Sequence, residues 1–165
     1  MEKLIARNAI RDDVLFFMLP AAFVFSAGMA VSAWELIRQQ GSLYILSAPS
    51  VVGLALIVIG LTINLTAAGT LRRSYSPTLV TREDHELVTR GVYRLLRHPI
   101  YLGTIMASVG LPVYVPSLYG LLTMSALVLL FLRRIGIEER MLTEAFGDAY
   151  RTYREATRKL VPFIY

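Results

Sequence analysis

The chain has 165 residues, of which 55% are hydrophobic and 18% are charged, and it carries a formal net charge of +5 and no cysteine. Soluble domains contain about 25% charged residues, so this composition predicts a single-domain integral membrane protein. The lack of cysteine excludes disulfides, thiolate nucleophiles and Cys-type metal sites. Two separated histidines are a poor ligand set, so we expect no metal. The basic residues flank apolar runs, which favours anionic lipid over nucleic acid as their partner.

Two apolar runs in the N-terminal half are long enough to cross a bilayer, which takes ~20 residues. The first extends from about Val14 to Ile37. It follows a charged segment that has no signal-peptide cleavage pattern, so we expect a retained span. The second extends from about Tyr44 to Gly69. Asn64 lies deep in this second run, where a polar side chain favours an interhelical hydrogen bond over a substrate contact.

The C-terminal half begins with the longest polar connection, Leu71 to Arg97, and continues with two shorter apolar segments, Ile100–Val115 and Ser117–Leu132. The Pro116 position predicts a tight turn and a helix start between these segments. The first segment is short for a full crossing, so the pair predicts either two spans or a partly inserted hairpin. The remainder, Arg133–Tyr165, predicts a charged amphipathic helix that packs on the membrane domain or lies at its interface.

The basic residues also predict the orientation of the chain. Sixteen of the seventeen lie in the N-terminal segment, in the 71–97 loop and in the C-terminal region. The positive-inside rule therefore places both termini and the 71–97 loop in the cytoplasm. The expected fold is all-α and polytopic, with about four transmembrane helices. The last two form a helical hairpin, and a cytoplasmic C-terminal amphipathic helix follows them.

The heptapeptide RHPIYLG, residues 97–103, is the first candidate for a binding site. Pro99 favours the first turn of a helix, and the free backbone donors of such a turn attract a carboxylate or phosphate. Gly103 allows a ligand or a neighbouring helix to approach closely. An interfacial belt, with Tyr101 as an anchor and arginine facing lipid headgroups, is the simpler interpretation of the same residues.

A second candidate site is formed by Arg134 and Glu138, which share one helix face because they are four positions apart. Alone they indicate an ordinary surface ion pair, worth less than about 1 kcal/mol. Beside His98 and Tyr101 on the same membrane face, they become a candidate for binding a charged ligand. Aromatic residues of the last helix indicate packing for Phe146 and Tyr153, and leave the role of Tyr150 open.

Four motifs together resemble the isoprenylcysteine carboxyl methyltransferase family, part of a wider membrane group that includes phospholipid N-methyltransferases. They are HELVTRGVYRLLRHPIYLG at 85–103, EE at 138–139, the Phe-Gly-x-x-Tyr-x-x-Tyr pattern at 146–153, and VPFI at 161–164. The resemblance covers roughly residues 76–165. It implies an S-adenosylmethionine-dependent methyltransferase whose lipophilic acceptor enters from the bilayer, with the carboxylate of a prenylcysteine favoured as the methylated group.

The resemblance also implies roles for individual residues within one domain, 1–165. Residues 1–70 supply two spans and residues 71–165 supply the cofactor-binding and catalytic part. Arg134 and Glu138 are the implied catalytic residues, and Arg134 also faces the substrate carboxylate. If the acceptor were an amine, Glu138 or Glu139 could act as the base. The implied cofactor contacts are His85, Glu86, Leu87, Val88, Tyr93, His98, Pro99, Ile100, Tyr101, Glu138 and Glu139.

Other functions stay open. A phospholipid or a small thiol could replace the prenylcysteine as acceptor. A sterol-reductase-like enzyme that binds NADPH would share the Arg-His-Pro-x-Tyr element, but Ile100 and Thr104 stand where that class typically has asparagine and an acid. A non-enzymatic membrane adaptor would keep its arginines only for orientation and lipid headgroups. The methyltransferase interpretation predicts membrane lipids and a lipophilic or prenylated substrate as partners, and no nucleic acid.

Overall fold

The structure is a computed structural model that describes residues 11–38, 47–71 and 87–160. Within these ranges the chain is helical and contains no strand, which confirms the helical fold class. The implied cofactor contacts His85 and Glu86 lie outside the described residues. In chain order the elements are the π-helix η1 (Val14–Met18), α2 (Leu19–Arg38), α3 (Ala48–Leu71), the 3-10 helix η3 (Gly91–Arg94), α4 (Pro99–Tyr114), α5 (Leu118–Phe146) and α6 (Asp148–Ala156).

Three of these helices are long and apolar enough to cross a membrane. They are the continuous helix Arg11–Arg38, which includes η1 and α2, and the helices α3 and α5. The fourth apolar helix, α4, has 16 residues, a length of about 24 Å at 1.5 Å per residue. The hydrocarbon core of a bilayer is about 30 Å thick, so α4 is shorter than a full perpendicular crossing.

The starts of α4 and α5 lie where the sequence predicts them. Pro99 is the first residue of α4, and His98 precedes it with non-helical backbone angles. The side chain of Ser117 caps α5 by accepting a hydrogen bond from the backbone N–H of Gly120 at 3.0 Å. Both starts follow from local chemistry, because proline lacks a donor and serine supplies an acceptor at a helix N-terminus.

The predicted boundary near Leu132 is wrong, because α5 continues as one helix to Phe146. Its buried face carries on past that point, with Phe131 and Ile135 lying one turn apart. The helix ends at Gly147, whose φ of +54° is a left-handed conformation that glycine adopts without steric cost. α5 is therefore about 44 Å long by its rise per residue and extends beyond the apolar segment.

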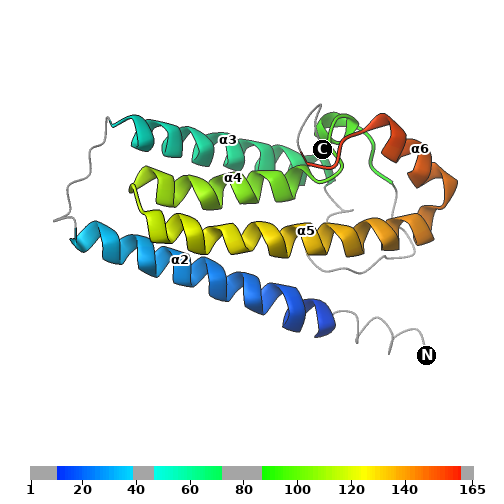
Figure 1. The fold of residues 1–165 in the computed structure, drawn as a ribbon. Helices are drawn as coiled ribbons and strands as arrows, with labels where there is room; N and C mark the ends of the chain where they lie inside the picture. The colour runs from blue at the N-terminus through cyan, green and yellow to red at the C-terminus, as the bar shows by residue number, and fades with distance from the viewer. Residues whose placement is uncertain (1–10, 39–46, 72–86, 161–165) are drawn as a thin grey trace.

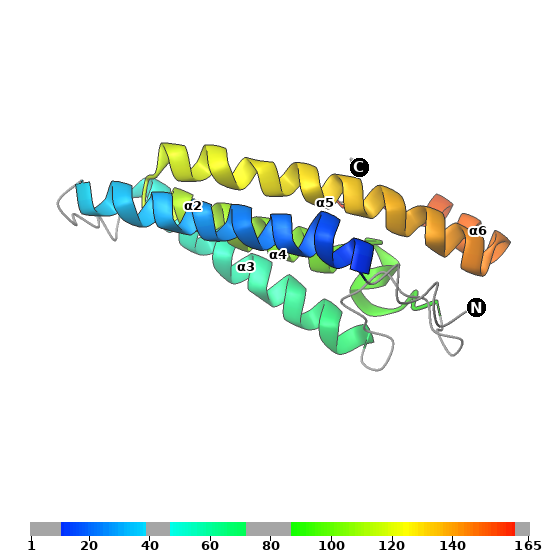
Figure 2. The same ribbon diagram turned by 90° about the horizontal axis from the view of Figure 1, so that it is seen from below.

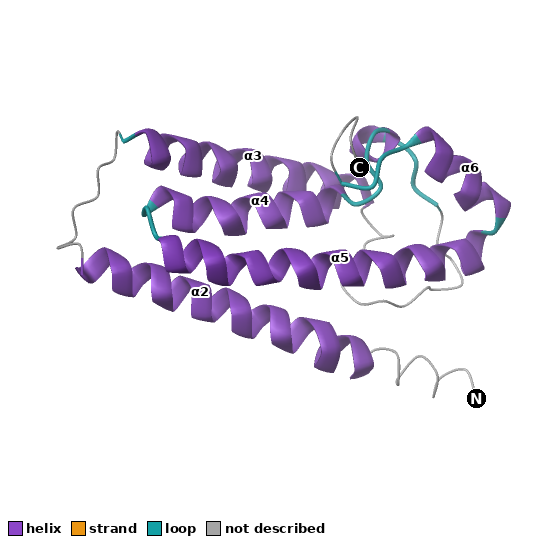
Figure 3. Cartoon of the chain, in the orientation of Figure 1, coloured by secondary structure: helices purple, strands orange, loops and turns teal. Residues whose placement is uncertain are grey.

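The helices form a bundle in which α4 lies between α3 and α5, and α2 packs along α5 (Figure 1). The view turned by 90° shows the same lengthwise alignment (Figure 2). Short loops join α4 to α5 and α5 to α6 (Figure 3). One end of the bundle holds the end of α3, the start of α4, the end of α5, and α6 (Figure 1). The predicted site residues that the structure describes gather at this end.

Helices α3 and α4 pack with their backbones in close contact. A Cβ added at Gly103 would collide with the backbone of α3 at Gly60 and Asn64, and one added at Gly53 would collide with α4 near Gly110. Small residues at membrane helix interfaces permit this approach. The neighbour that Gly103 admits is therefore a helix, one of the two alternatives predicted from the sequence.

Asn64 makes the interhelical hydrogen bonds that the sequence predicts. Its side-chain amide donates to the Ile100 carbonyl at 3.2 Å and to the Thr104 hydroxyl at 2.9 Å. The acceptor at Ile100 belongs to the first turn of α4, so this contact holds the entry of α4 against α3. The α3–α4 pair is thus a tightly fitted support for the residues at the start of α4.

Between α4, α5 and the first helix, the core consists of larger side chains. Met124, Leu127 and Phe131 of α5 are buried, and Phe17 and Tyr101 pack against them. Phe17 belongs to η1, where the backbone N–H of Leu19 bonds the Val14 carbonyl five residues back. Pro20 follows this widened turn and has no N–H of its own, which removes one regular helical bond at this point.

Candidate active site

The entry into α4 is fixed by the C-terminal segment of the chain. The backbone N–H groups of Arg97 and His98 donate to the carbonyls of Arg158 and Lys159 at 2.8 and 3.2 Å. The N–H of Arg158 donates in return to the Leu95 carbonyl at 3.0 Å. The residues after α6 therefore run beside the loop before α4 and hold the orientation of the side chains at that loop.

Arg97 connects three parts of the site end. Its Nε atom lies 2.7 Å from Glu139 Oε1, and both side chains are nearly inaccessible to solvent. Its Nη1 atom donates to the carbonyls of Thr157 at 2.6 Å and Arg154 at 3.0 Å. These carbonyls belong to the end of α6, where a cation is favoured. Arg97 was not among the predicted site residues, although it begins the RHPIYLG motif.

Glu139 is buried and surrounded by basic side chains. Besides Arg97, the Nε2 atom of His98 lies 3.4 Å from Glu139 Oε1, and Lys159 Nζ lies 3.9 Å from Glu139 Oε2. A buried carboxylate requires such partners, since an unpaired charge in the interior costs several kcal/mol. Glu139 consequently holds α5, the start of α4 and the C-terminal segment together.

Tyr101 joins the two predicted catalytic residues through its hydroxyl. That hydroxyl donates to Glu138 Oε2 at 2.6 Å and accepts from Arg134 Nε at 2.9 Å. The ring of His98 stacks on the Tyr101 ring, with centroids 5.7 Å apart and planes 11° apart. Arg134 and Glu138, four positions apart on α5, are thus connected by a residue of α4. The sequence suggested a direct pair on one helix face.

Arg134 is buried, so its interpretation as half of an ordinary surface ion pair is wrong. Its Nη1 atom lies 2.8 Å from Asp13 Oδ1, and the exposed fractions of the two side chains are 4% and 1%. Its guanidinium group lies 4.1 Å from the centroid of the Phe17 ring. Asp13 was not predicted as a site residue. In the sequence, the only indication of its role is that this acid directly precedes the apolar run that begins at Val14.

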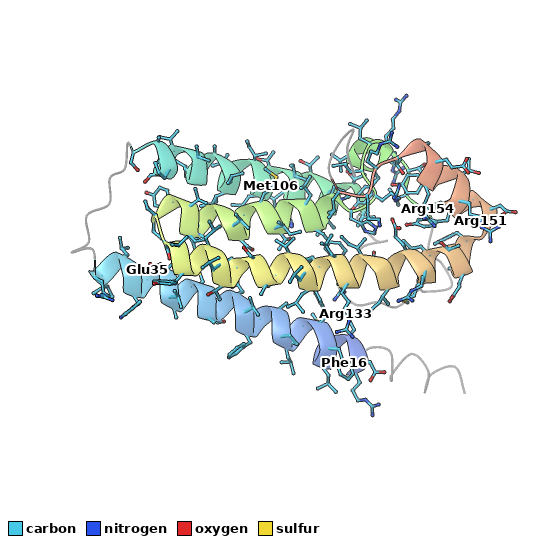
Figure 4. The ribbon with its side chains drawn as sticks, in the orientation of Figure 1. Phe16, Glu35, Met106, Arg133, Arg151 and Arg154 are labelled. Atoms are coloured by element: carbon cyan, nitrogen blue, oxygen red, sulfur yellow. The ribbon has the colours of Figure 1, made fainter. Side chains whose placement is uncertain are left out.

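A cavity of about 240 Å³ lies between the beginning of the first helix and α5. Phe16 and Arg133, which line it, are near each other where the first helix passes below α5 (Figure 4). The Oδ2 atom of Asp13 is buried and has no hydrogen-bond partner among the described residues. The remaining lining residues combine apolar side chains with charged ones, and the full set is Asp12, Asp13, Phe16, Phe17, Leu130, Arg133, Arg134, Ile137 and Met141.

The other predicted cofactor contacts that the structure describes lie around the start of α4. Pro99 and Tyr93 are buried, whereas Leu87, Val88 and Ile100 are partly buried. The backbone carbonyl of Tyr93 accepts a hydrogen bond from the hydroxyl of Tyr153 on α6.

Two tyrosines of α6 face the bundle. Tyr153 donates its hydroxyl to the Tyr93 carbonyl at 2.7 Å, which confirms its predicted packing role. Burial raises the pKa of Tyr153 to about 12. Burial also raises the pKa of Tyr150, and the negative charge of Glu139 adds to that rise. Within the part of the chain that the structure describes, the buried Tyr150 hydroxyl has no hydrogen-bond partner.

Comparisons with known proteins give the same assignment as the motifs. The family model described as phospholipid methyltransferase matches residues 49–149. The chain is 37% identical over 115 residues to protein-S-isoprenylcysteine O-methyltransferase A of Arabidopsis thaliana, which covers 68% of this chain and 58% of that protein. It is 36% identical over 118 residues to a probable protein-S-isoprenylcysteine O-methyltransferase of Oryza sativa subsp. japonica, covering 70% and 62%.

A solved structure is also similar. It is that of a eukaryotic intramembrane Ras methyltransferase, an isoprenylcysteine carboxyl methyltransferase, with a TM-score of 0.76 and 27% sequence identity. The likeness covers 93% of this chain and 56% of that one. The chain therefore spans less than two thirds of the length of these relatives. The resemblance indicated by the sequence motifs is confirmed, and since the family model matches more than half of the chain, the chain belongs to the phospholipid methyltransferase family.

Proposed function

We propose that this protein is an S-adenosylmethionine-dependent membrane methyltransferase that methylates the carboxylate of a lipophilic, prenylcysteine-like acceptor. The observation that carries the proposal is the chain of contacts from Arg134 through Tyr101 to Glu138, next to a cavity that Arg134 and several apolar side chains line. It supplies a cation for a substrate carboxylate and an anion for a cationic cofactor group, within one hydrogen-bonded unit. The similarity to protein-S-isoprenylcysteine O-methyltransferases supports the choice of acceptor.

The residues present fit the cofactor chemically. S-adenosylmethionine carries an ammonium, a carboxylate and a sulfonium, so its site needs both signs of charge. Glu138 has a side chain that is 29% exposed, against 8% for Glu139, so Glu138 is the carboxylate available to the ammonium. The first turn of α4 offers backbone donors for the carboxylate. The hydroxyl of Tyr150, which has no partner in residues 11–38, 47–71 and 87–160, is one further donor, and the Tyr101 ring suits a cation by cation–π attraction.

The bound cofactor supplies the methyl group, and the protein's own residues orient and isolate the acceptor. Arg134 is held by Tyr101 and Asp13 and stacked on Phe17, so its guanidinium presents a fixed direction to a carboxylate. A carboxylate is already a nucleophile and needs no base. Rate enhancement then comes mainly from proximity and orientation, with apolar side chains of the cavity excluding water.

An amine acceptor is the second candidate, because the matching family model is described as phospholipid methyltransferase. Methylation of an ammonium group requires that a proton leaves first. Glu138 is the better base of the two acids, since Glu139 is engaged by Arg97 and His98. This candidate uses the same Tyr101–Glu138 contact, with Glu138 accepting a proton.

The proposal includes a topology. Four spans cross the membrane, with α4 and α5 as a hairpin, and the site end of the bundle faces the cytoplasm with both termini and the 71–97 loop. In α6 the side chains of Tyr150 and Tyr153 are buried, and Arg151 lies on the outer side of the helix (Figure 4). The Nε atom of Arg154 lies 4.0 Å from Glu139 Oε2. Such a helix suits the membrane surface. The proposed cofactor contacts also include His85, Glu86, Leu87 and Val88.

The test is methyl transfer by the purified protein in lipid nanodiscs. Radiolabelled S-adenosylmethionine is offered with N-acetyl-S-farnesylcysteine, with phosphatidylethanolamine or with a simple thiol. The expected product is a base-labile methyl ester of the farnesylcysteine. Stable label in phosphatidylethanolamine alone would favour the amine candidate. Absence of saturable S-adenosylmethionine binding by calorimetry would overturn both candidates.

A further inference from the structure

Leu95 is a large apolar side chain at the charged end of the bundle, and it is 63% exposed. Among the described residues, every other exposed large hydrophobic side chain belongs to a helix that is long and apolar enough to cross a membrane. Lipid surrounds such helices, so their exposed apolar side chains contact hydrocarbon. Leu95 lies outside them, between η3 and α4. Its exposure has the same physical explanation if hydrocarbon also reaches this position.

The position of η3 places Leu95 at the membrane interface. Helix η3, drawn in green in Figure 1, lies beside the end of α3. A Cβ added at Gly91, the first residue of η3, would lie 3.1 Å from the side chain of Thr70 in the last turn of α3. With 24 residues, α3 is about 36 Å long. Since the hydrocarbon core is about 30 Å thick, this last turn lies at the headgroups when α3 crosses the bilayer.

Three exposed arginines lie next to Leu95 in the folded backbone. Arg94 precedes it directly, and Arg90 precedes η3, where its carbonyl accepts a hydrogen bond from the N–H of Tyr93 at 3.2 Å. Arg158 comes from the segment after α6, and its N–H donates to the Leu95 carbonyl at 3.0 Å. In the part of the chain that the structure describes, none of these three arginine side chains forms an ion pair.

An exposed leucine among arginines matches the chemistry of an anionic membrane surface. Guanidinium groups form paired hydrogen bonds with phosphate oxygens, and basic residues near an anionic leaflet are attracted to it. The acyl chains below the headgroups receive the leucine side chain. An acidic protein surface also neutralises arginine, but it offers no hydrocarbon at this depth. The bilayer supplies both groups, and it is the partner that surrounds the end of α3.

We propose an interfacial anchor that inserts a leucine into the bilayer and binds the headgroups of anionic phospholipids through arginines; it consists of Arg90, Arg94, Leu95 and Arg158. The backbone joins this anchor to the candidate site, because the N–H of Arg97 donates to the Arg158 carbonyl at 2.8 Å. None of the anchor side chains belongs to the candidate site, so lipid binding by the anchor holds or fails independently of methyl transfer.

The depth of position 95 can be measured with a single fluorophore, because the natural chain contains no cysteine. Leu95→Cys is labelled with bimane in vesicles of phosphatidylcholine that contain phosphatidylglycerol. The controls are Leu65→Cys on α3, where the leucine is 71% exposed, and Asp148→Cys, where the side chain is 92% exposed. We expect acyl-chain spin labels to quench positions 95 and 65, and aqueous acrylamide to quench position 148. Acrylamide quenching at position 95 as strong as at position 148 would overturn the proposal.

The headgroup preference is measured with the same probe at position 95. Quenching by spin-labelled phosphatidylglycerol is compared with quenching by spin-labelled phosphatidylcholine at equal mole fraction. We expect about 5-fold or greater local enrichment of phosphatidylglycerol, as for at least one arginine at an anionic surface. The combined variant Arg90→Gln, Arg94→Gln and Arg158→Gln should lower this ratio to about 1. The control Arg151→Gln removes an exposed arginine of α6 that pairs with Asp148, and it should preserve the ratio.

A salt titration makes the test independent of the folding of the combined variant. With the arginines intact, ~1 M salt shortens the Debye length to about 3 Å and should bring the ratio close to 1. Equal quenching by the two lipids at low salt, or a ratio that salt leaves unchanged, overturns the anchor. A high ratio that survives the three glutamine substitutions also overturns it, since the positive charge of the whole bundle end would then attract the lipid. Protection of position 95 only after addition of a poly-glutamate peptide would indicate a protein partner instead.

Discussion

The two helix pairs of the bundle are packed in different ways. Between α3 and α4, backbones meet at Gly60 and Gly103, where even a methyl group would collide with main-chain atoms. Between the first helix and α5, contact near the site is made by large side chains and by the buried Asp13–Arg134 pair, and a cavity of about 240 Å³ lies there. The first interface has no space for a ligand, and the second has both space and charge.

This difference indicates that the two helix interfaces have different roles in the protein. The α3–α4 pair fixes the position of the α4 entry, from which His98 and Tyr101 reach α5. The first helix closes the other side of the site through side-chain contacts of Phe17 and Asp13 with α5. Outer faces of the bundle stay apolar, as Phe23 and Leu65, 74% and 71% exposed, illustrate. A lipid-facing surface of this kind requires no further cover.

The largest expected effect is a loss of folding when the α3–α4 contact is opened. Gly103→Leu places a branched side chain against the backbone of α3, and overpacking of this kind costs ~3 kcal/mol or more. We expect little monodisperse protein in detergent, measured by fluorescence-detected size exclusion. Gly69→Leu is the matched control, because a Cβ there meets nothing within 4 Å. Normal yield of Gly103→Leu would contradict the view of this interface as a rigid support.

Next in size is the effect of Glu138→Gln, which removes the accessible carboxylate without changing the shape of the side chain. We expect kcat/KM to fall ~100-fold through weaker binding of a cationic cofactor group, with yield and melting temperature nearly unchanged. The comparison variant is Glu144→Gln, at an exposed position of the same helix. Equal S-adenosylmethionine affinity in Glu138→Gln and the natural protein would remove Glu138 from the cofactor site.

Tyr101→Phe should have a smaller effect, because it keeps the ring and removes only the hydroxyl between Arg134 and Glu138. Two charge-assisted bonds disappear, and both charged partners become less well positioned. We expect a ~10-fold decrease in kcat/KM, since hydrogen bonds to charged groups contribute about 1.5–3 kcal/mol and part is recovered by rearrangement. Steady-state kinetics with a carboxylate acceptor measures it. An unaltered rate would show that the two charges act independently.

The smallest expected effect concerns Asn64, which lies at the closely packed interface between α3 and α4. Asn64→Ala removes the bonds to Ile100 and Thr104, and interhelical hydrogen bonds in membranes contribute about 0.6 kcal/mol on average. We expect a slightly lower thermal midpoint and an unchanged KM. Thr62→Ala is the control, because its hydroxyl donates to the Val58 carbonyl of its own helix. A large change in KM would give Asn64 a role in binding.

Local features of the fold were predictable from the sequence. Pro99 and Ser117 mark helix starts by their own backbone chemistry, and Asn64 needs a partner because it lies in an apolar run. The family motifs also contain Tyr101 and Glu138. The predicted end of α5 near Leu132 is too early, because the change from apolar to charged residues there resembles the start of a new element. Helix α5 instead carries those residues onward from the apolar segment.

The sequence by itself determined the helical membrane class, the family and most of the charged residues of the candidate site. Tertiary structure alone decided how these residues pair. Asp13 and Arg134 are 121 positions apart in the chain, and Arg97 before α4 is 42 positions from its partner Glu139 on α5. Such pairs depend on the rotation and offset of packed helices, which a periodic pattern does not specify. Arg134 resembles a surface charge in the sequence. In the folded chain it is buried at the centre of the site, because the first helix packs against α5 and brings Asp13 to it.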